Sequence, residues 1–207
     1  MYILSRRFQA DDIIAKHCVF FAALENQYDT IDRISGNQIV ANNVVANMMT
    51  WDNGMNMYRF RNQGRGTTYA ASCVNLNIKI TNNGYAMLYD LIIPINNAVA
   101  ANGFGSYSGI ALHNLPGMQI GILKKLAIVF TPRMIEYGGL RAINFYFDGV
   151  LTLSNKYDSD LLANSLNTIT FIHGNSATYN NGDCCQKNFM IFNKMLTVDE
   201  IKKIQKI

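Results

Sequence analysis

Asp148 is the first acid to consider as a functional residue, because it stands between two apolar runs in INFYFDGVLTL, from Ile143 to Leu153. Glycoside hydrolysis would need such an acid together with a second carboxylate at a fixed separation across a sugar ring. The chain has only three glutamates and no alternating run of acids on one strand face, and the pattern around Glu200 is that of a helix cap. The pair Asp148 and Gly149 instead matches the two-residue turn of a type I′ hairpin. We therefore expect a structural acid and no enzymatic activity.

The histidines and cysteines do not form a recognisable catalytic or zinc-binding arrangement. His17, His113 and His173 are far apart in the sequence, and none stands in a nucleophile motif. A zinc site would need closely spaced ligand pairs, and no CxxC spacing occurs. Buried or idle thiols are therefore expected at the four cysteines, which are Cys18, Cys73, Cys184 and Cys185.

Calcium is the one metal that the sequence leaves open. Ca²⁺ is held by carboxylate and amide oxygens in loops, and Asp32, Asn181 and Asp183 are candidates of this kind. Their spacing does not resemble a dedicated calcium loop. We expect no cofactor, with calcium as the alternative.

Two loops have the composition of a sugar-binding site. Such sites combine an aromatic platform with amide hydrogen bonds, and both occur in TWDNGMNMYRF and in NGFGSYSG. Alternatively, the aromatic residues anchor long loops to the body of the domain. The predicted ligand-binding residues are Trp51, Asn53, Tyr107 and Asn175.

Composition excludes some classes of partner. The net charge is +4, and charged residues make up only 15% of the chain, while asparagine supplies about one residue in eight. The basic residues are scattered, apart from the arginines in YRFRNQGRG, so nucleic-acid binding is not expected. No apolar run reaches the ~20 residues that cross a bilayer, so we expect no membrane partner. CVFFAAL is too short and too far from the start for a signal peptide, and it is interpreted as a buried strand.

The hydrophobic pattern has a period of two over most of the chain. VNLNIKI alternates strictly between apolar and polar residues, and YAMLYDLIIPI, KLAIVFT, NTITFIHGN and KNFMIFN are further strand candidates. GIALHNL and GMQIGIL are two shorter ones, the second running from Gly117 to Leu123. Many short strands separated by turn signals indicate an all-β sandwich or barrel in one domain.

The two ends of the chain differ from this pattern. Thr197 and Glu200 form the signature of a capping box, and Leu196 with Ile201 that of a hydrophobic staple, so LTVDEIKKIQKI predicts a short terminal helix. The stretch that begins at Asp11 could be a helix or two strands. We favour an extended N-terminal arm over residues 1–16, followed by the domain at 17–207.

Three stretches taken in order resemble the laminin G-like branch of the concanavalin A-like lectin and glucanase superfamily. They are AINFYFDGVLTL, TFIHGNS and KNFMIFNKMLTVDEIKKI, and VFFAALENQYDTIDRISGN resembles the opening strand of that family. The family's usual tryptophan near Leu88 is absent, because the single tryptophan is Trp51. The resemblance implies an all-β fold, a two-sheet antiparallel jelly-roll sandwich, to which the C-terminal helix is added. The functions that it implies are diverse, and include glycan binding, adhesion and structural roles.

The functional prediction combines this fold with the composition. Laminin G-like sandwiches usually work outside cells, yet the chain begins with methionine and shows no leader or glycosylation motif. We predict a non-enzymatic virion structural protein, such as a bacteriophage capsid decoration or head-fibre protein. It would be made in the host cytoplasm, lie on the virion surface, form homo-oligomers and contact other virion or capsid proteins. The alternative is a glycan-binding lectin or adhesion module of a bacterium, with a cell-surface glycan as its partner.

Overall fold

The computed structural model describes residues 11–41, 49–61, 71–78, 83–94, 103–104, 115–158, 166–170 and 183–206. Residues 11–17 form an N-terminal helix. The strands are β1 (Cys18–Ala22), β2 (Val40–Ala41), β3 (Met49–Asp52), β4 (Met57–Arg61), β5 (Ala71–Ile78), β6 (Tyr85–Ile92), β7 (Gly103–Phe104), β8 (Lys124–Phe130), β9 (Arg141–Phe147), β10 (Val150–Tyr157), β11 (Leu166–Thr170) and β12 (Asp183–Phe192). A 3₁₀ turn, η2 (Ile135–Tyr137), precedes β9, and helix α2 (Val198–Gln205) follows β12.

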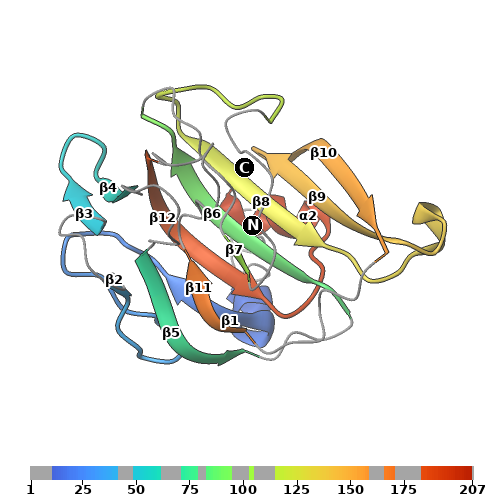
Figure 1. The fold of residues 1–207 in the computed structure, drawn as a ribbon, viewed down its shortest axis with the longest axis horizontal. Helices are drawn as coiled ribbons and strands as arrows, with labels where there is room; N and C mark the ends of the chain where they lie inside the picture. Colours follow the sequence, from blue (N-terminus) through green and yellow to red (C-terminus); the bar gives the residue numbers. More distant parts are fainter. Residues whose placement is uncertain are drawn as a thin grey trace, which may run out of the picture.

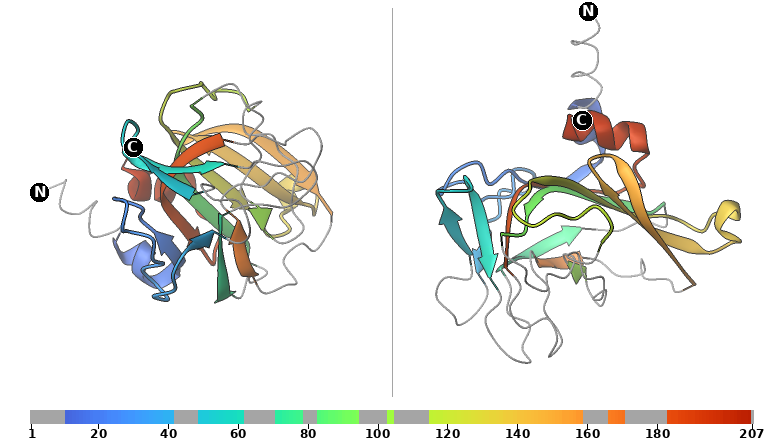
Figure 2. Two further views of the ribbon diagram at one scale, coloured as in Figure 1. Left: turned by 60° about the vertical axis from the view of Figure 1, so that its left-hand side comes forward. Right: turned by 90° about the horizontal axis from the view of Figure 1, so that it is seen from above.

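The described strands form two antiparallel sheets. The larger sheet has eight strands in the order β10-β9-β8-β6-β12-β4-β3, with β1 also paired to β12, and the smaller has the order β2-β5-β11-β7. Figure 1 shows the larger sheet face-on, and in the right-hand view of Figure 2 the smaller sheet lies on one side of it while both helices lie on the other. The predicted fold class, an all-β two-sheet sandwich with a short C-terminal helix, is confirmed.

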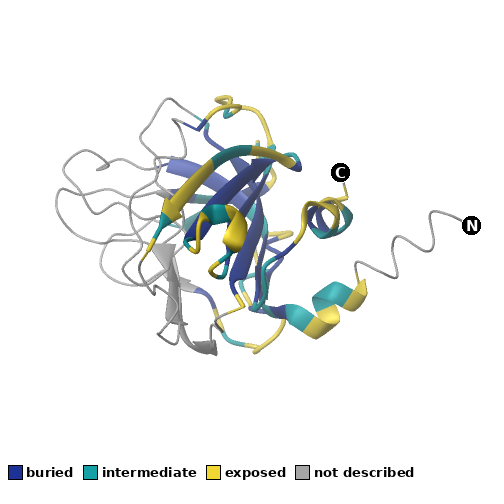
Figure 3. Cartoon of the chain, turned by 90° about the vertical axis from the view of Figure 1, so that its right-hand side faces the viewer, coloured by how far each residue is buried: buried dark blue, intermediate teal, exposed yellow. Residues whose placement is uncertain are grey.

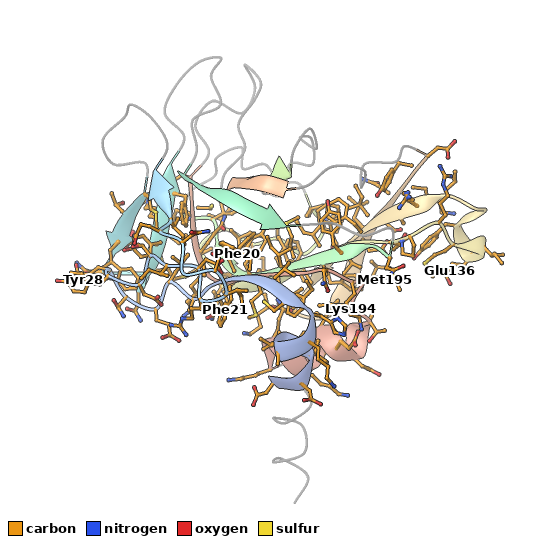
Figure 4. The ribbon with its side chains drawn as sticks, turned by 90° about the horizontal axis from the view of Figure 1, so that it is seen from below. Phe20, Phe21, Tyr28, Glu136, Lys194 and Met195 are labelled. Atoms are coloured by element: carbon orange, nitrogen blue, oxygen red, sulfur yellow. The ribbon has the colours of Figure 1, made fainter. Side chains whose placement is uncertain are left out.

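The central strands of the larger sheet are buried on both faces. Every residue of β6 is buried, as expected for a continuously apolar strand that lies between two layers. Tyr85, Met87, Tyr89 and Leu91 of this strand belong to one apolar cluster with Phe20. Figure 4 shows Phe20 on the side of the smaller sheet, whereas the neighbouring Phe21 points to the side that carries the helices.

The helix-side cluster fixes α2 against the sheet. Ala86 and Leu88 of β6, with Ala127 of β8, pack there against Ile201 and Ile204 of the helix. Figure 3 shows both helices with their less exposed faces turned towards the sheet. The predicted short terminal helix is therefore confirmed.

The hairpin between β9 and β10 has the predicted turn. Phe147 pairs with Val150 across two residues, and both Asp148 (φ 50°) and Gly149 (φ 74°) are left-handed. Two positive φ angles define a type I′ turn, whose twist matches that of the strands.

Two local expectations differ from the structure. Residues 11–17 are helical instead of extended, and Ile13 and Ile14 pack partly against the helix-side cluster. The strand expected at Gly117–Leu123 is a loop of turns, in which Gly117 (φ 86°) and Gly121 (φ 72°) are left-handed. The remaining residues of the predicted arm, 1–10, lie outside the described residues.

No helix in the described ranges is long and apolar enough to span a membrane.

Candidate functional site

A hollow among the described residues lies on the helix side of the larger sheet. It has a volume of about 1150 Å³ and lies between α2, the helix at 11–17 and strands β6, β8 and β12. We call it the α2 groove. Its lining comprises Asp11, Ile14, Phe21, Glu25, Leu88, Tyr89, Asp90, Lys125, Asn188, Met190, Asp199, Lys202, Lys203, Ile204, Gln205 and Lys206.

Helix α2 forms one wall of the groove, and its sequence fixes both of its ends. The Glu200 N–H donates to Thr197 Oγ1 at 3.3 Å, and the Thr197 N–H donates to Glu200 Oε2 at 2.9 Å, which completes the predicted capping box. At the other end, the Gln205 side-chain amide donates to the backbone oxygen of Leu126 at 3.0 Å. The wall is therefore tied to β8, which carries part of the floor.

A β-bulge in β12 shapes the floor. One edge of β12 pairs with β4 over Asp183–Gln186 and with β1 over Phe189–Phe192. Asn188 lies where the neighbouring strand changes from β4 to β1, and its backbone has φ 54°. Its N–H donates to the backbone oxygen of Ala23 at 2.9 Å. The register with β6 shifts over the same residues. Bulges of this kind re-aim a side chain, and here the side chain of Asn188 turns onto β6.

A polar cluster lies on the floor around Asp90. Asn188 Nδ2 donates to Asp90 Oδ2 at 2.8 Å, and Lys125 Nζ lies 3.4 Å from Asp90 Oδ1. The Asp90 side chain is only 8% exposed, so its charge is held where water is scarce and a base lies beside it. The three side chains come from three adjacent strands, β12, β6 and β8.

The groove lining also includes apolar side chains and charged side chains of both signs. The Arg33 guanidinium lies over the Phe21 ring, with its central carbon 5.3 Å from the ring centroid. Met190 and Ile204 also line the groove. Lys202, Lys203 and Lys206 extend from α2, and none of them forms an ion pair within the described part of the chain. A ligand could thus find apolar, hydrogen-bonding and charged contacts in one concavity.

A second charged cluster, at Arg59, is closed by its own partners. Arg59 Nε and Nη2 donate to the two oxygens of Asp183 at 2.8 and 2.6 Å, and Nη1 donates to Asp52 at 3.2 Å. These carboxylates raise the pKa of Arg59. The pKa of Asp52 is lowered by the hydrogen bond from the Met55 N–H, together with the contact with Arg59. Bidentate pairing of this kind is strong and leaves Asp183 engaged.

The two calcium candidates that lie in the described ranges form hydrogen bonds with other residues of the chain. Asp32 is fully buried and accepts hydrogen bonds from the N–H groups of Phe21, Ile34 and Ser35 at 2.8 to 3.1 Å, and another from the Ser35 hydroxyl. Asp183 is bound by Arg59, and Asn181 lies outside the described residues. Within the described ranges, no group of three or more His, Cys, Asp and Glu side chains is placed to hold a metal ion.

The predicted sugar-binding residues are only partly described. Trp51 is half-buried at the end of β3, meets the Tyr58 ring edge-on with centroids 5.3 Å apart, and packs against the core. Asn53 is exposed in the turn that follows. Tyr107 and Asn175 lie outside the described residues. Trp51 has the contacts of an anchor, and a ligand role for these four residues stays a prediction.

The sequence did not indicate the residues of the groove floor. Asp90 and Lys125 are 35 residues apart, and Asp90 and Asn188 are 98 residues apart, so that only the strand order brings them together. One signal was present, because Asp90 is the single charge in the buried run YAMLYDLIIPI. An acid in such a run needs a partner, and its partner could not be named from the sequence.

No family model matches the chain, and no curated protein matches it. Several solved structures superpose on the chain. The botulinum neurotoxin type G receptor-binding domain superposes with a TM-score of 0.56 at 14% identity, over 92% of this chain and 51% of that one. A sialidase of Trypanosoma rangeli in complex with sialic acid superposes with a TM-score of 0.51 at 10% identity, over 98% and 37%.

The likeness is one of fold. At these identities the comparisons establish a β-sandwich shared with the two proteins, and the chain spans about half the length of the toxin domain. The geometry of the groove is therefore the basis for a functional argument.

Proposed function

We propose that the chain is a non-enzymatic glycan-binding module, built as a laminin G-like sandwich. The observation that carries this proposal is the α2 groove, which combines apolar walls with a buried carboxylate, an amide and an ammonium group at its floor. Sugars present both C–H faces and hydroxyl groups, so sites that bind them combine these two kinds of surface. The sialidase with a similar fold was solved in complex with sialic acid, which supports this ligand class.

Three of the described acids, Asp52, Asp90 and Asp183, suit a binding role better than hydrolysis. A glycosidase acid must keep its proton, which requires a raised pKa, and a second carboxylate must face it across the sugar. Asp52 has a lowered pKa, because the Met55 N–H and Arg59 stabilise its charged form. Asp183 and Asp90 each contact a basic side chain. These groups are therefore suited to accept hydrogen bonds.

A glycan array probed with the full chain tests the proposal. We expect at least one group of related glycans to bind above background and to compete in solution with the free oligosaccharide. The same glycans, incubated with the protein and analysed by mass spectrometry, should remain uncleaved. A folded protein that binds no glycan on the array, or that releases sugar, would refute the proposal.

The virion setting is a separate proposal, which rests on the low charge and high asparagine content of the sequence. A glycan-binding module on a virion would recognise a host-surface glycan. Co-purification of the protein with particles would support this setting, and its absence from purified particles would refute it.

A further inference from the structure

We propose that the floor of the α2 groove binds a neutral pyranose ring through Asp90, Asn188 and Lys125. This inference rests on the proposed glycan-binding function and names the site and the class of sugar. It concerns a face of the sandwich where the sequence predicted no ligand.

The three residues form a row across the middle of the larger sheet. Asp90 of β6 is the direct cross-strand partner of Lys125 in β8 and, on its other side, of Lys187 in β12, the residue before Asn188. Directly opposed side chains lie close enough to act on one ligand. The row is therefore carried by three hydrogen-bonded strands.

The bulge at Asn188 lies where the neighbour of β12 changes from β4 to β1, and it turns the Asn188 amide towards Asp90. A regular strand would carry β12 past β6 without a left-handed residue, yet Asn188 has φ 54°, and Leu24, next to its backbone partner Ala23, has φ 54° as well. Left-handed residues other than glycine are uncommon, and for leucine this conformation is costly. Such strain collects at binding sites, and here it directs an amide at the buried carboxylate.

The cluster retains hydrogen-bonding capacity. Lys125 Nζ carries three protons and has one partner among the described residues, while the Asn188 side-chain oxygen has none there. Two neighbouring hydroxyl groups of a pyranose could accept from Lys125 and donate to Asn188 and Asp90. Each hydroxyl both donates and accepts, which matches a site with both kinds of group.

Charge selects the class of sugar. The acids in the groove lining (Asp11, Glu25, Asp90 and Asp199) equal its lysines in number (Lys125, Lys202, Lys203 and Lys206), so the lining carries no net charge. A sugar carboxylate placed on the floor would meet the Asp90 carboxylate at close range, and its repulsion would oppose binding. The half-buried ring of Phe21, which also lines the groove, offers an apolar surface for the C–H face of a neutral ring.

Direct titration tests the proposal. The probes are the methyl pyranosides of glucose, galactose and mannose, with sialyllactose as the acidic probe, followed by calorimetry or NMR. We expect at least one neutral pyranoside to bind, and Asn188→Gly and Asp90→Asn to weaken it at least tenfold. Asn188→Gly removes the amide and favours the left-handed backbone, while Asp90→Asn keeps the shape of the floor. Glu136→Gln, a carboxylate-to-amide change on η2 outside the groove lining, is the matched control and should bind as the natural protein does.

The outcomes separate this site from the proposed function. If the glycan array is positive but both floor variants bind like the control, the module binds glycans elsewhere and this site is wrong. If only sialyllactose binds, the neutral class is wrong. If the array and all pyranosides are negative, the proposed function itself fails. The thermal midpoint of each variant shows whether a loss of binding comes from a loss of folding, and agreement of the two floor variants guards against an effect of one substitution.

Discussion

Asp148 and Lys125 exchange two hydrogen bonds across the β8–β9 edge of the larger sheet. The Asp148 N–H donates to the Lys125 oxygen at 2.9 Å, and the Lys125 N–H donates to Asp148 Oδ1 at 3.0 Å. The other carboxylate oxygen lies 3.1 Å from Lys124 Nζ. The hairpin turn is thus attached to the first residues of β8, and Asp148 has a structural task in addition to its left-handed backbone.

This pairing predicts a difference between two substitutions of Asp148. Asn keeps an acceptor for the Lys125 N–H and tolerates a positive φ, so Asp148→Asn should change the free energy of unfolding by less than about 0.5 kcal/mol, mostly through the half-exposed contact with Lys124. Asp148→Ala loses the acceptor and is strained at φ 50°, so it should cost about 2 kcal/mol. Urea unfolding of the two variants measures both values. Equal costs would show that the charge, and not the acceptor, is what matters.

The hairpin also predicts an interaction between Gly149 and Lys202. A Cβ at Gly149 would lie 2.8 Å from Lys202 Cγ, and the backbone there has φ 74°. Gly149→Ala should cost about 1–2 kcal/mol, chiefly for the left-handed backbone, since the lysine chain can move aside. The same change made in a Lys202→Ala background separates the two causes. The cost should shrink only slightly there, and its disappearance would show that the clash dominates.

The sequence predicted those elements whose signals are local. The continuous apolar run of β6, the Asp148–Gly149 turn and the Thr197–Glu200 cap each follow from neighbouring residues, and the structure contains all three. The strand predicted at Gly117–Leu123 is wrong, because apolar residues alternate there as they do in a strand. Gly117 and Gly121 bend the segment instead.

The N-terminal helix and the groove were missed for a different reason. Residues 11–17 could be a helix or strands by sequence, and packing of Ile13 and Ile14 beside α2 favours the helix. The groove floor depends on strand order and on a bulge at Asn188, neither of which has a local signal. Candidate sites made by distant strands therefore require the structure.

The cap of α2 predicts a dependence of stability on pH. Burial alone would raise the pKa of Glu200, but hydrogen bonds from Lys194 and Thr197 outweigh it, and the pKa is lowered from its ordinary value of 4.5. Because the folded-state pKa lies below the unfolded one, the stabilisation is fully present above about pH 4.5 and is lost as the pH falls through the folded pKa. Glu200→Gln should therefore flatten the acid side of the stability curve.

Thermal unfolding between about pH 3 and pH 7 measures this effect. Thr197→Ala should cost about 1 kcal/mol at neutral pH, and Thr197→Ser, which keeps the hydroxyl, should cost much less. A natural protein and a Glu200→Gln variant that lose stability in parallel on acidification would assign the acid sensitivity to other carboxylates.

The buried thiols predict slow alkylation at any pH that the fold survives. Burial raises the pKa of Cys18 to about 12 and also raises that of Cys184, and Cys185 is buried beside it. The thiolate is the reactive form, so iodoacetamide at about pH 8 should leave these three cysteines unmodified in the folded protein and label them in urea. Peptide mass mapping in a Cys73→Ser background identifies each site. Raising the reaction to about pH 9 should not label Cys18 in the folded protein, because its thiol stays protonated and enclosed. Rapid native labelling of Cys18 alone would show that β1 and the helix before it open from the sheet, and that the wall of the α2 groove opens with them.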